Sequence, residues 1–293
     1  MIEKGKQKHS RAMFQEDRLY NGRNVNGLVG IGISTSCFYP METERVLEKE
    51  IALGFRTYEV FFNSPSELEE SFVRGLKKQA DAAKGKIVSL HPFTSGYESY
   101  LLFSQYRRRF EDGLLMYDGY FRAAKLLGAD ILVIHGEKNR PFFSDEEYLE
   151  RFRILAERGK RFGVRVAQEN VVEHRSQNPE FIRKMRRELK DNAYFVLDIK
   201  QCIRSRVSPF EMCDAMGDRL IHLHANDHSE ERDCVLPGEG KMDYRRLFAQ
   251  MKAAGFSGSC VLEVYRDAIH SEEELVRAGR TLEAFAKQAG WGR

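Results

Sequence analysis

Short runs rich in β-branched and aromatic residues alternate, from about residue 27 onward, with longer amphipathic stretches. Each run has six or seven residues, a common length for a strand, and the stretches between them have the spacing of surface helices. The pattern predicts strands that alternate with helices. The eight runs are Leu28–Ser34, Arg56–Phe61, Lys86–His91, Asp130–His135, Val164–Asn170, Ala193–Ile199, Arg219–Ala225 and Ser259–Tyr265.

Several of the intervening stretches carry signals for the start or the end of a helix. Four of them have the capping-box pattern, in which a serine precedes a glutamate by three residues. Gly54, Gly128 and Gly255 stand where helices are expected to end, because glycine adopts the left-handed conformation of a helix cap without strain. The capping pairs are Ser66 with Glu69, Ser144 with Glu147, Ser208 with Glu211, and Ser271 with Glu274.

Strands that alternate with helices favour a parallel sheet. Eight such units within about 265 residues match a closed barrel, which typically takes ~250 residues as one domain. We therefore predict the α/β class and a single (β/α)8 TIM barrel over residues 27–293. An open doubly wound sheet is the structural alternative, but no GxGxxG motif follows the first run to indicate a dinucleotide site.

Residues 1–26 fall outside the repeat and form a short N-terminal extension. Six Lys and Arg stand against three Asp and Glu there, an excess that equals the net charge of +3 of the whole chain. We expect a solvated basic tail rather than a partner-binding arm.

The composition narrows the class of protein. The 293 residues are 42% hydrophobic and 31% charged, and no apolar run approaches the ~18 residues that span a bilayer. The first residues lack the apolar core of a signal peptide, and the five cysteines are scattered without a CxxC pair. We expect a cytoplasmic protein with reduced thiols and no membrane partner. The balance of 47 Lys and Arg against 44 Asp and Glu argues against a nucleic-acid partner.

Histidines and carboxylates end six consecutive runs. Barrel enzymes carry their reacting groups at the C-terminal ends of the strands, so these residues are the candidates for chemistry. Residues two positions apart point to the same side of a strand. Five of the end residues therefore share a face with the residue two positions before them, which is Val133, Ala167, Val196, His222 or Val261. We expect all the end residues to point inward together. They are His91, His135, Glu169, Asp198, His224 and Glu263.

A lone histidine at a strand end is more often a structural, hydrogen-bonded group than a ligand. Several carboxylates and imidazoles at one barrel mouth are harder to explain as structural groups, because the carboxylates repel one another and lose hydration unless a cation neutralises them. Nitrogen and oxygen donors without thiolate suit Mn²⁺, Zn²⁺, Co²⁺ or Fe²⁺, and suit Mg²⁺ less well. We expect one divalent ion. The predicted ligands are Glu169, Asp198, His224 and Glu263.

His91 and His135 have two open interpretations. They either hold a second ion or bind the substrate. His222 lies one layer deeper in the barrel, and we expect it to orient a ligand.

The order and spacing of seven motifs carry a family resemblance: GFRTYEV, AKLLGADILVIHG, AQEN, VLDIK, HLHAND, LPGEG and LEVY. The chain resembles the xylose isomerase-like TIM-barrel superfamily over residues 27–293. That superfamily includes sugar-phosphate isomerases and epimerases, inosose dehydratases, hydroxypyruvate isomerases, ketose 3-epimerases and endonuclease IV. The motifs together indicate the superfamily and leave the reaction open.

The resemblance implies that the same four residues are ligands of the ion, and that Glu169 and Glu263 exchange a proton at carbon from opposite faces of the substrate. We therefore expect a divalent-metal-dependent isomerase or epimerase that acts on a small sugar, keto-sugar or sugar phosphate by proton transfer next to a carbonyl. The alternatives are an endonuclease IV-like phosphodiesterase, a sugar or polyol dehydratase, and a sugar-binding barrel without catalysis. Homo-oligomerisation stays open.

Two positions depart from the family pattern. Gln201 stands where the family often has histidine, and Cys234 stands where endonucleases have histidine and ketose epimerases have arginine. These changes argue against a third zinc site and against cleavage of abasic DNA. The predicted substrate-binding residues are His91, His135, Gln201, Arg232 and Glu59. Lys200 and Arg204 also lie near strand ends, where they are expected at the surface.

Overall fold

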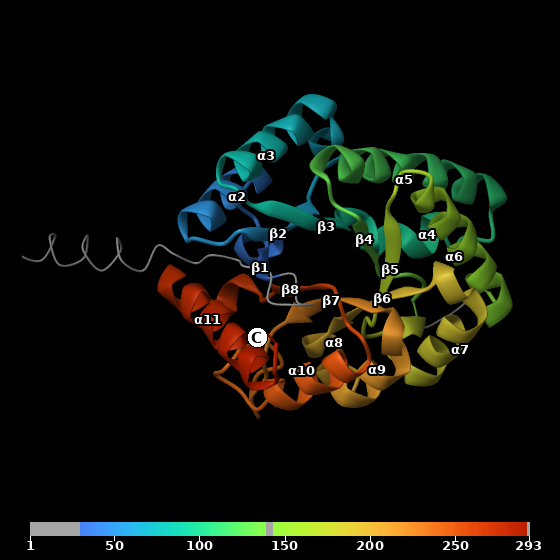
Figure 1. The fold of residues 1–293 in the computed structure, drawn as a ribbon. Coiled ribbons are helices and arrows are strands. Elements are labelled where there is room, and N and C mark those ends of the chain that lie inside the picture. The colour runs from blue at the N-terminus through green and yellow to red at the C-terminus, as the bar shows by residue number, and fades with distance from the viewer. Residues whose placement is uncertain (1–29, 139–142, 292–293) are drawn as a thin grey trace, which may run out of the picture.

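The computed structural model describes residues 30–138 and 143–291. Eight parallel strands close into a barrel, paired in sequence order from β1 to β8 and back to β1, with the helices arranged around them (Figure 1). The predicted (β/α)8 barrel is confirmed, and the open sheet is excluded. The strands are β1 (Ile31–Ser34), β2 (Thr57–Phe62), β3 (Lys86–Pro92), β4 (Ile131–Ile134), β5 (Arg165–Glu169), β6 (Tyr194–Asp198), β7 (Leu220–Ala225) and β8 (Ser259–Leu262).

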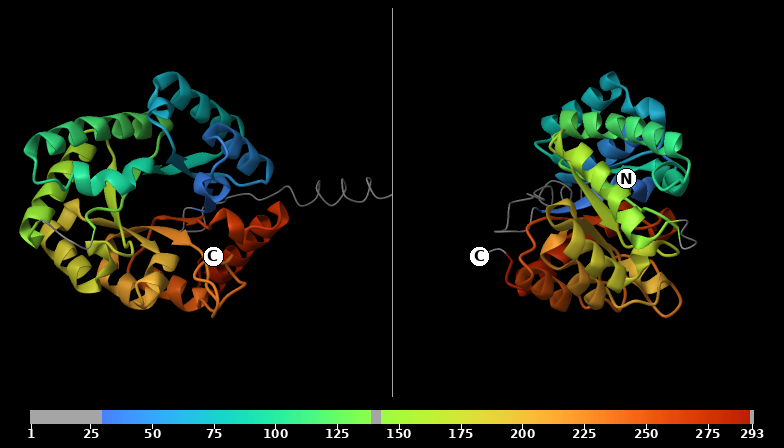
Figure 2. Two further views of the ribbon diagram at one scale, coloured as in Figure 1. Left: turned by 180° about the vertical axis from the view of Figure 1, so that it is seen from behind. Right: turned by 90° about the vertical axis from the view of Figure 1, so that its right-hand side faces the viewer.

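The helices form the outer layer of the barrel, which Figure 2 shows from behind and from the side. Two strands are each followed by two helices: α4 and α5 after β3, and α8 and α9 after β6. Among the helices of the described residues, none combines the length and apolar character needed to cross a membrane. The helices are α2 (Thr43–Ala52), α3 (Glu70–Ala82), α4 (Glu98–Leu101), α5 (Arg107–Leu127), α6 (Asp145–Lys160), α7 (Pro179–Leu189), α8 (Ile199–Arg204), α9 (Pro209–Met216), α10 (Tyr244–Ala253) and α11 (Glu272–Gln288).

Most of the predicted helix ends are confirmed. Ser144 and Glu147 form a reciprocal capping box at the start of α6, and the Glu274 carboxylate accepts the Ser271 N–H at the start of α11. The three glycines at helix ends all have positive φ, between 76° and 98°, as a left-handed cap requires.

The capping box predicted at Ser66 is wrong. Pro65 begins a short 3-10 helix, Pro65–Leu68, and α3 starts only at Glu70 with Glu69 as its N-cap. The ring of Pro65 favours the first position of a helical turn, so Ser66 lies inside that turn instead of capping the next helix. Ser208 is the N-cap residue of α9, but its side chain makes no capping hydrogen bond.

Strand register places the ends of β5 to β8 at one mouth of the barrel, with Asp198 two residues beyond the partner of Glu169. Glu169 pairs with Val196, Asp198 with His224, and His224 with Val261. β8 ends at Leu262, three residues before the end of the predicted run, although the Glu263 N–H still donates to the Ala225 carbonyl. The chain then turns into a 3-10 helix.

The hydrophobic core has two parts. A large cluster fills the space between strands and helices. A separate small cluster includes Ile131 together with Val133, Ala167 and Val196, and the last three were expected to share the inward face with the strand-end groups. The expected alternation is therefore present in β4, β5 and β6. The expected tail, residues 1–26, lies outside the described residues.

Gly258 allows the close approach of β7 and β8 that sets this register. A Cβ at Gly258 would lie 1.8 Å from the Ile221 carbonyl oxygen. We expect Gly258→Ala to destabilise the protein by about 1–3 kcal/mol, because two backbones must separate to admit the methyl group.

Gly75→Ala is the matched control. Gly75 lies within α3, and a Cβ there would meet nothing within 4 Å, so the same substitution should stabilise by about 0.5–1 kcal/mol. Urea unfolding of both variants measures the difference. A Gly258→Ala protein as stable as the parent would contradict the steric argument.

Candidate metal centre and substrate cavity

Four groups from neighbouring strands converge at the C-terminal mouth of the barrel. Glu169 and Asp198 are the last residues of β5 and β6, His224 lies near the end of β7, and Glu263 directly follows β8. One donor atom from each lies within 4.8 Å of the others. The His224 Nδ1 atom is 3.4 Å from Glu169 Oε1, 3.8 Å from Asp198 Oδ2 and 3.2 Å from Glu263 Oε2. The structure brings together the four predicted ligands.

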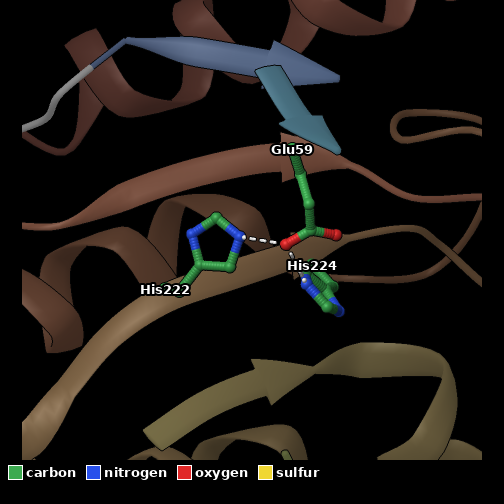
Figure 3. Close-up of side chains that lie close together, drawn as sticks. All are labelled: Glu59, His222 and His224. Atoms are coloured by element: carbon green, nitrogen blue, oxygen red, sulfur yellow. Dashed lines mark hydrogen bonds and ion pairs between the residues drawn. The ribbon is translucent and has the colours of Figure 1, made fainter. Parts of the chain in front are cut away.

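The carboxylate of Glu59 on β2 contacts the rings of both His222 and His224, as Figure 3 shows. Its Oε2 atom lies 3.2 Å from Nε2 of His224 and 3.0 Å from Nε2 of His222, and the carboxylate also accepts the hydroxyls of Ser34 and Ser89. Burial alone would raise the pKa of Glu59, but the neighbouring imidazoles hold it well below its usual range. The ionised Glu59 therefore favours a proton on Nε2 of His224 and leaves Nδ1 to face the other carboxylates.

This arrangement bears on Glu59, which was predicted to bind substrate. The side chain is fully buried, and it does not line the cavity above the cluster. It therefore supports a candidate ligand histidine instead of contacting a substrate directly. His222, which hydrogen-bonds Glu59 from one layer deeper, acts on the ligand cluster through Glu59.

Two asparagines hold Asp198 in place. The Asn226 amide donates to Asp198 Oδ1 (3.1 Å), and Asn170 exchanges hydrogen bonds with the backbone N–H and carbonyl of Asp198. The backbone N–H of Gln201 also donates to Oδ1, which leaves Oδ2 directed at His224. Sequence reasoning missed both asparagines, although AQEN and HAND place each of them within two residues of a predicted ligand.

His91, His135 and Glu169 form a second group of potential ligands. The Glu169 Oε2 atom lies 2.8 Å from Nε2 of His135 and 3.5 Å from Nε2 of His91. Because Oε1 faces His224, Glu169 joins the two groups. Glu98 on α4 supports this side of the site by accepting the backbone N–H groups of His135 and Gly136; no sequence signal identified it.

Lys200 occupies an unexpected position. It was expected at the surface, but it is only 5% exposed, and its ammonium forms ion pairs with Asp198 and Glu263. Helix α8 starts directly after Asp198, so its first turn lies over the strand ends. Burial opposes the charge, yet the two carboxylates raise the pKa of Lys200 well above its usual range.

A cavity of about 490 Å³ opens above the cluster. His91, His135 and Gln201 line it as predicted, and so do Glu169 and Glu263. The side-chain oxygen of Gln201 accepts the Val172 N–H, which holds the amide at the cavity wall. Further lining residues are Ser36, Tyr39, Phe61, Asn63, Phe93, Lys200, Val264 and Tyr265.

Arg232 does not line this cavity. Its guanidinium lies 3.3 Å from Asp267 Oδ2, and it lines a neighbouring pocket together with Cys234 and Asp233. The structure therefore places this predicted substrate contact apart from His91, His135 and Gln201, which line the cavity.

Comparison with known proteins places this geometry in a family. The family model described as xylose isomerase-like TIM barrel matches residues 47–285. An uncharacterised protein of Mycobacterium bovis is 24% identical over 271 residues, which cover 84% of this chain and 92% of the relative. Fructoselysine 3-epimerase of Escherichia coli O157:H7 is 36% identical over 73 residues, 25% of this chain and 26% of that protein.

Solved structures show the same fold. A D-tagatose 3-epimerase-like protein aligns with a TM-score of 0.73 at 18% identity, covering 89% of this chain and 98% of the other. D-psicose 3-epimerase of Clostridium cellulolyticum H10 aligns with a TM-score of 0.72 at 16% identity, covering 88% and 98%. The family match and the arrangement of strand-end ligands agree, and the chain belongs to the xylose isomerase-like TIM barrel family.

Proposed function

We propose that this protein is a divalent-metal-dependent isomerase or epimerase of a small sugar, keto-sugar or sugar phosphate, and that it works by proton transfer next to a carbonyl. The observation that carries the proposal is the convergence of Glu169 and Glu263 with Asp198 and His224 beneath a small cavity. The sugar epimerases among the similar structures and relatives support it.

The residues fit a divalent ion. Nδ1 of His224 is buried and, among the described residues, lacks a hydrogen-bond partner, while three carboxylates surround it. Such a donor set of one nitrogen and several oxygens suits Mn²⁺, Zn²⁺, Co²⁺ or Fe²⁺ better than Mg²⁺. Glu169, Asp198, His224 and Glu263 would hold the ion. When bound, it would stabilise negative charge on a substrate oxygen.

The two glutamates have different neighbours, which suits a reaction with two proton-transfer sites. Burial raises the pKa of Glu169, but His135 and its other imidazole neighbours hold it well below its usual range. The ionised Glu169 can take a proton from a carbon next to a carbonyl, and the imidazole of His135 beside Oε2 can carry that proton onward. Glu263 would serve the other face of the substrate.

The cavity fits a small polyhydroxylated molecule. Its volume lies within the range of small-molecule sites, roughly 300–1,000 Å³. Aromatic rings of Tyr39, Phe61, Phe93 and Tyr265 offer apolar walls for the C–H faces of a sugar, and polar groups such as Asn63 offer hydrogen bonds to hydroxyls.

Phosphodiester cleavage has less support. The place where endonucleases carry a zinc-binding histidine holds Cys234, which lines the neighbouring pocket. Burial raises the pKa of the Cys234 thiol to about 11, which favours the protonated thiol in the metal-free protein.

Replacement of Glu263 by glutamine should lower turnover by about 10²–10⁴, because the carboxylate that exchanges the proton is lost. Deuterium exchange from solvent into a panel of ketoses and their phosphates measures the rate, and elemental analysis measures the bound metal. His224→Ala is the comparison variant and should lose metal first and activity as a consequence. A Glu263→Gln protein that holds its metal and keeps the parent rate would rule out the two-glutamate mechanism.

Glu59→Gln should weaken metal binding by roughly 10–100-fold, because an amide no longer fixes the tautomer of His224. Ser34→Ala removes the hydrogen bond to the opposite Glu59 oxygen and the contacts of the same hydroxyl with Ser36. It leaves the Glu59 contact with His224 in place and is the comparison variant, with affinity close to that of the parent. Titration of metal-free protein with Mn²⁺ gives both affinities. Equal affinities in Glu59→Gln and the parent would show that Glu59 only fills space.

The purified protein should not cleave DNA that contains an abasic site, with or without added Zn²⁺, because the third zinc site lacks its histidine. Gel analysis of a labelled duplex tests this at several salt concentrations. Efficient metal-dependent cleavage that falls steeply with salt would overturn the assignment to small sugars.

A further inference from the structure

Lys200 lies within the carboxylate cluster but has no part in the proposed proton transfer. Its ammonium forms ion pairs with both Asp198 and Glu263, and its side chain is nearly as buried as theirs. A buried cation between two candidate metal ligands needs an explanation, since burial of an ammonium is unfavourable without close anionic partners.

The ammonium uses the same oxygen atoms that face the candidate ligand histidine. Asn226 and the Gln201 backbone already occupy Oδ1 of Asp198, so Oδ2 is the oxygen left to bind a cation. Lys200 contacts this Oδ2 and Oε2 of Glu263, and Nδ1 of His224 lies 3.8 Å and 3.2 Å from the same two atoms. The lysine therefore stands where an ion bound by these residues would stand.

We propose that Lys200 is a resident cation of this site, which holds Asp198 and Glu263 together in the metal-free protein and must leave before a divalent ion can bind. The inference rests on the proposed function, because it takes these carboxylates as metal ligands. Two cations on the same two buried oxygens repel one another strongly where the dielectric constant is low. A divalent ion would compete successfully with the ammonium for these oxygens, since it would also bind Glu169 and His224 and carries twice the charge.

The cavity wall provides a place for the displaced ammonium. The ring of Tyr265 has its centroid 5.7 Å from Nζ of Lys200, and Tyr265 lines the cavity. The ammonium already lies within cation–π range of this ring, so its release from the carboxylates would exchange two ion pairs for water in the cavity and keep the contact with Tyr265. Lys200 thereby lowers the affinity of the site for metal, since every binding event must first release the lysine.

Lys200→Met removes the charge and keeps most of the side-chain volume. We expect metal-free Lys200→Met to bind Mn²⁺ at least ~10-fold more tightly than the parent in calorimetric titrations, because the competing cation is gone. The same variant without metal should melt at a lower temperature than the parent, because Asp198 and Glu263 then face one another without a cation. Lys241→Met is the matched control: Lys241 pairs with Glu230 at the surface, and its loss should change neither quantity.

The outcomes separate this inference from the proposed function. Equal or weaker Mn²⁺ binding by Lys200→Met, with metal bound by the parent, overturns the competition and leaves the function intact. Binding by Lys200→Met alone supports the competition and overturns metal dependence in the natural chain. Binding by neither protein overturns both.

A crystal structure of the parent with Mn²⁺ provides a second test that does not depend on the folding of a variant. We expect Nζ of Lys200 to have left both carboxylates when the ion is bound. An ammonium still in contact with both oxygens beside a bound ion overturns the displacement.

Discussion

Four carboxylates lie buried around one imidazole at the mouth of the barrel, and this concentration of negative charge constrains everything near it. His224 faces Glu59 through Nε2 and the other three carboxylates through Nδ1. Burial disfavours a charged imidazole, but Glu263 and Glu59 hold the pKa of His224 well above its usual range. Buried carboxylates require hydrogen bonds or cations, and the neighbouring serines, asparagines and Lys200 supply them.

The buried charges are arranged in layers along the barrel axis, each with a different role. Glu59 and His222 form a deep layer, in which Nε2 of His222 contacts Glu59 Oε2 and the Ser89 hydroxyl. The candidate ligands lie directly above, on strand ends whose positions the sheet hydrogen bonds hold. The cavity wall above them is built mostly from loops, which vary without disturbing the strands. Such a division explains how one fold supports many sugar substrates.

Glu169 and Glu263 both face Nδ1 of His224 but have different further neighbours. Glu169 contacts the imidazoles of His91 and His135. Glu263 contacts Lys200, whose raised pKa makes it a fixed positive charge. Glu169 therefore has imidazole neighbours where Glu263 has an ammonium, although both glutamates lie at or just beyond the end of a strand.

The sequence by itself determined the barrel and the candidate ligand set. Strand parity is local, so the alternation of Val196 with Asp198 already directed the carboxylate inward, and the parallel strands of a closed barrel end at one edge. The order and spacing of the motifs along the chain also indicated the family.

Tertiary structure alone decided the partners of these groups. Glu98 lies 37 residues from His135, whose backbone it binds, and Glu59 lies 165 residues from His224; no local pattern predicts such pairs. Lys200 and Arg232 both stand near strand ends, yet one is buried in the site and the other lines a neighbouring pocket. The path of the chain beyond each strand decides this difference, because side-chain direction there follows the packing of helices and loops and has no fixed period in the sequence.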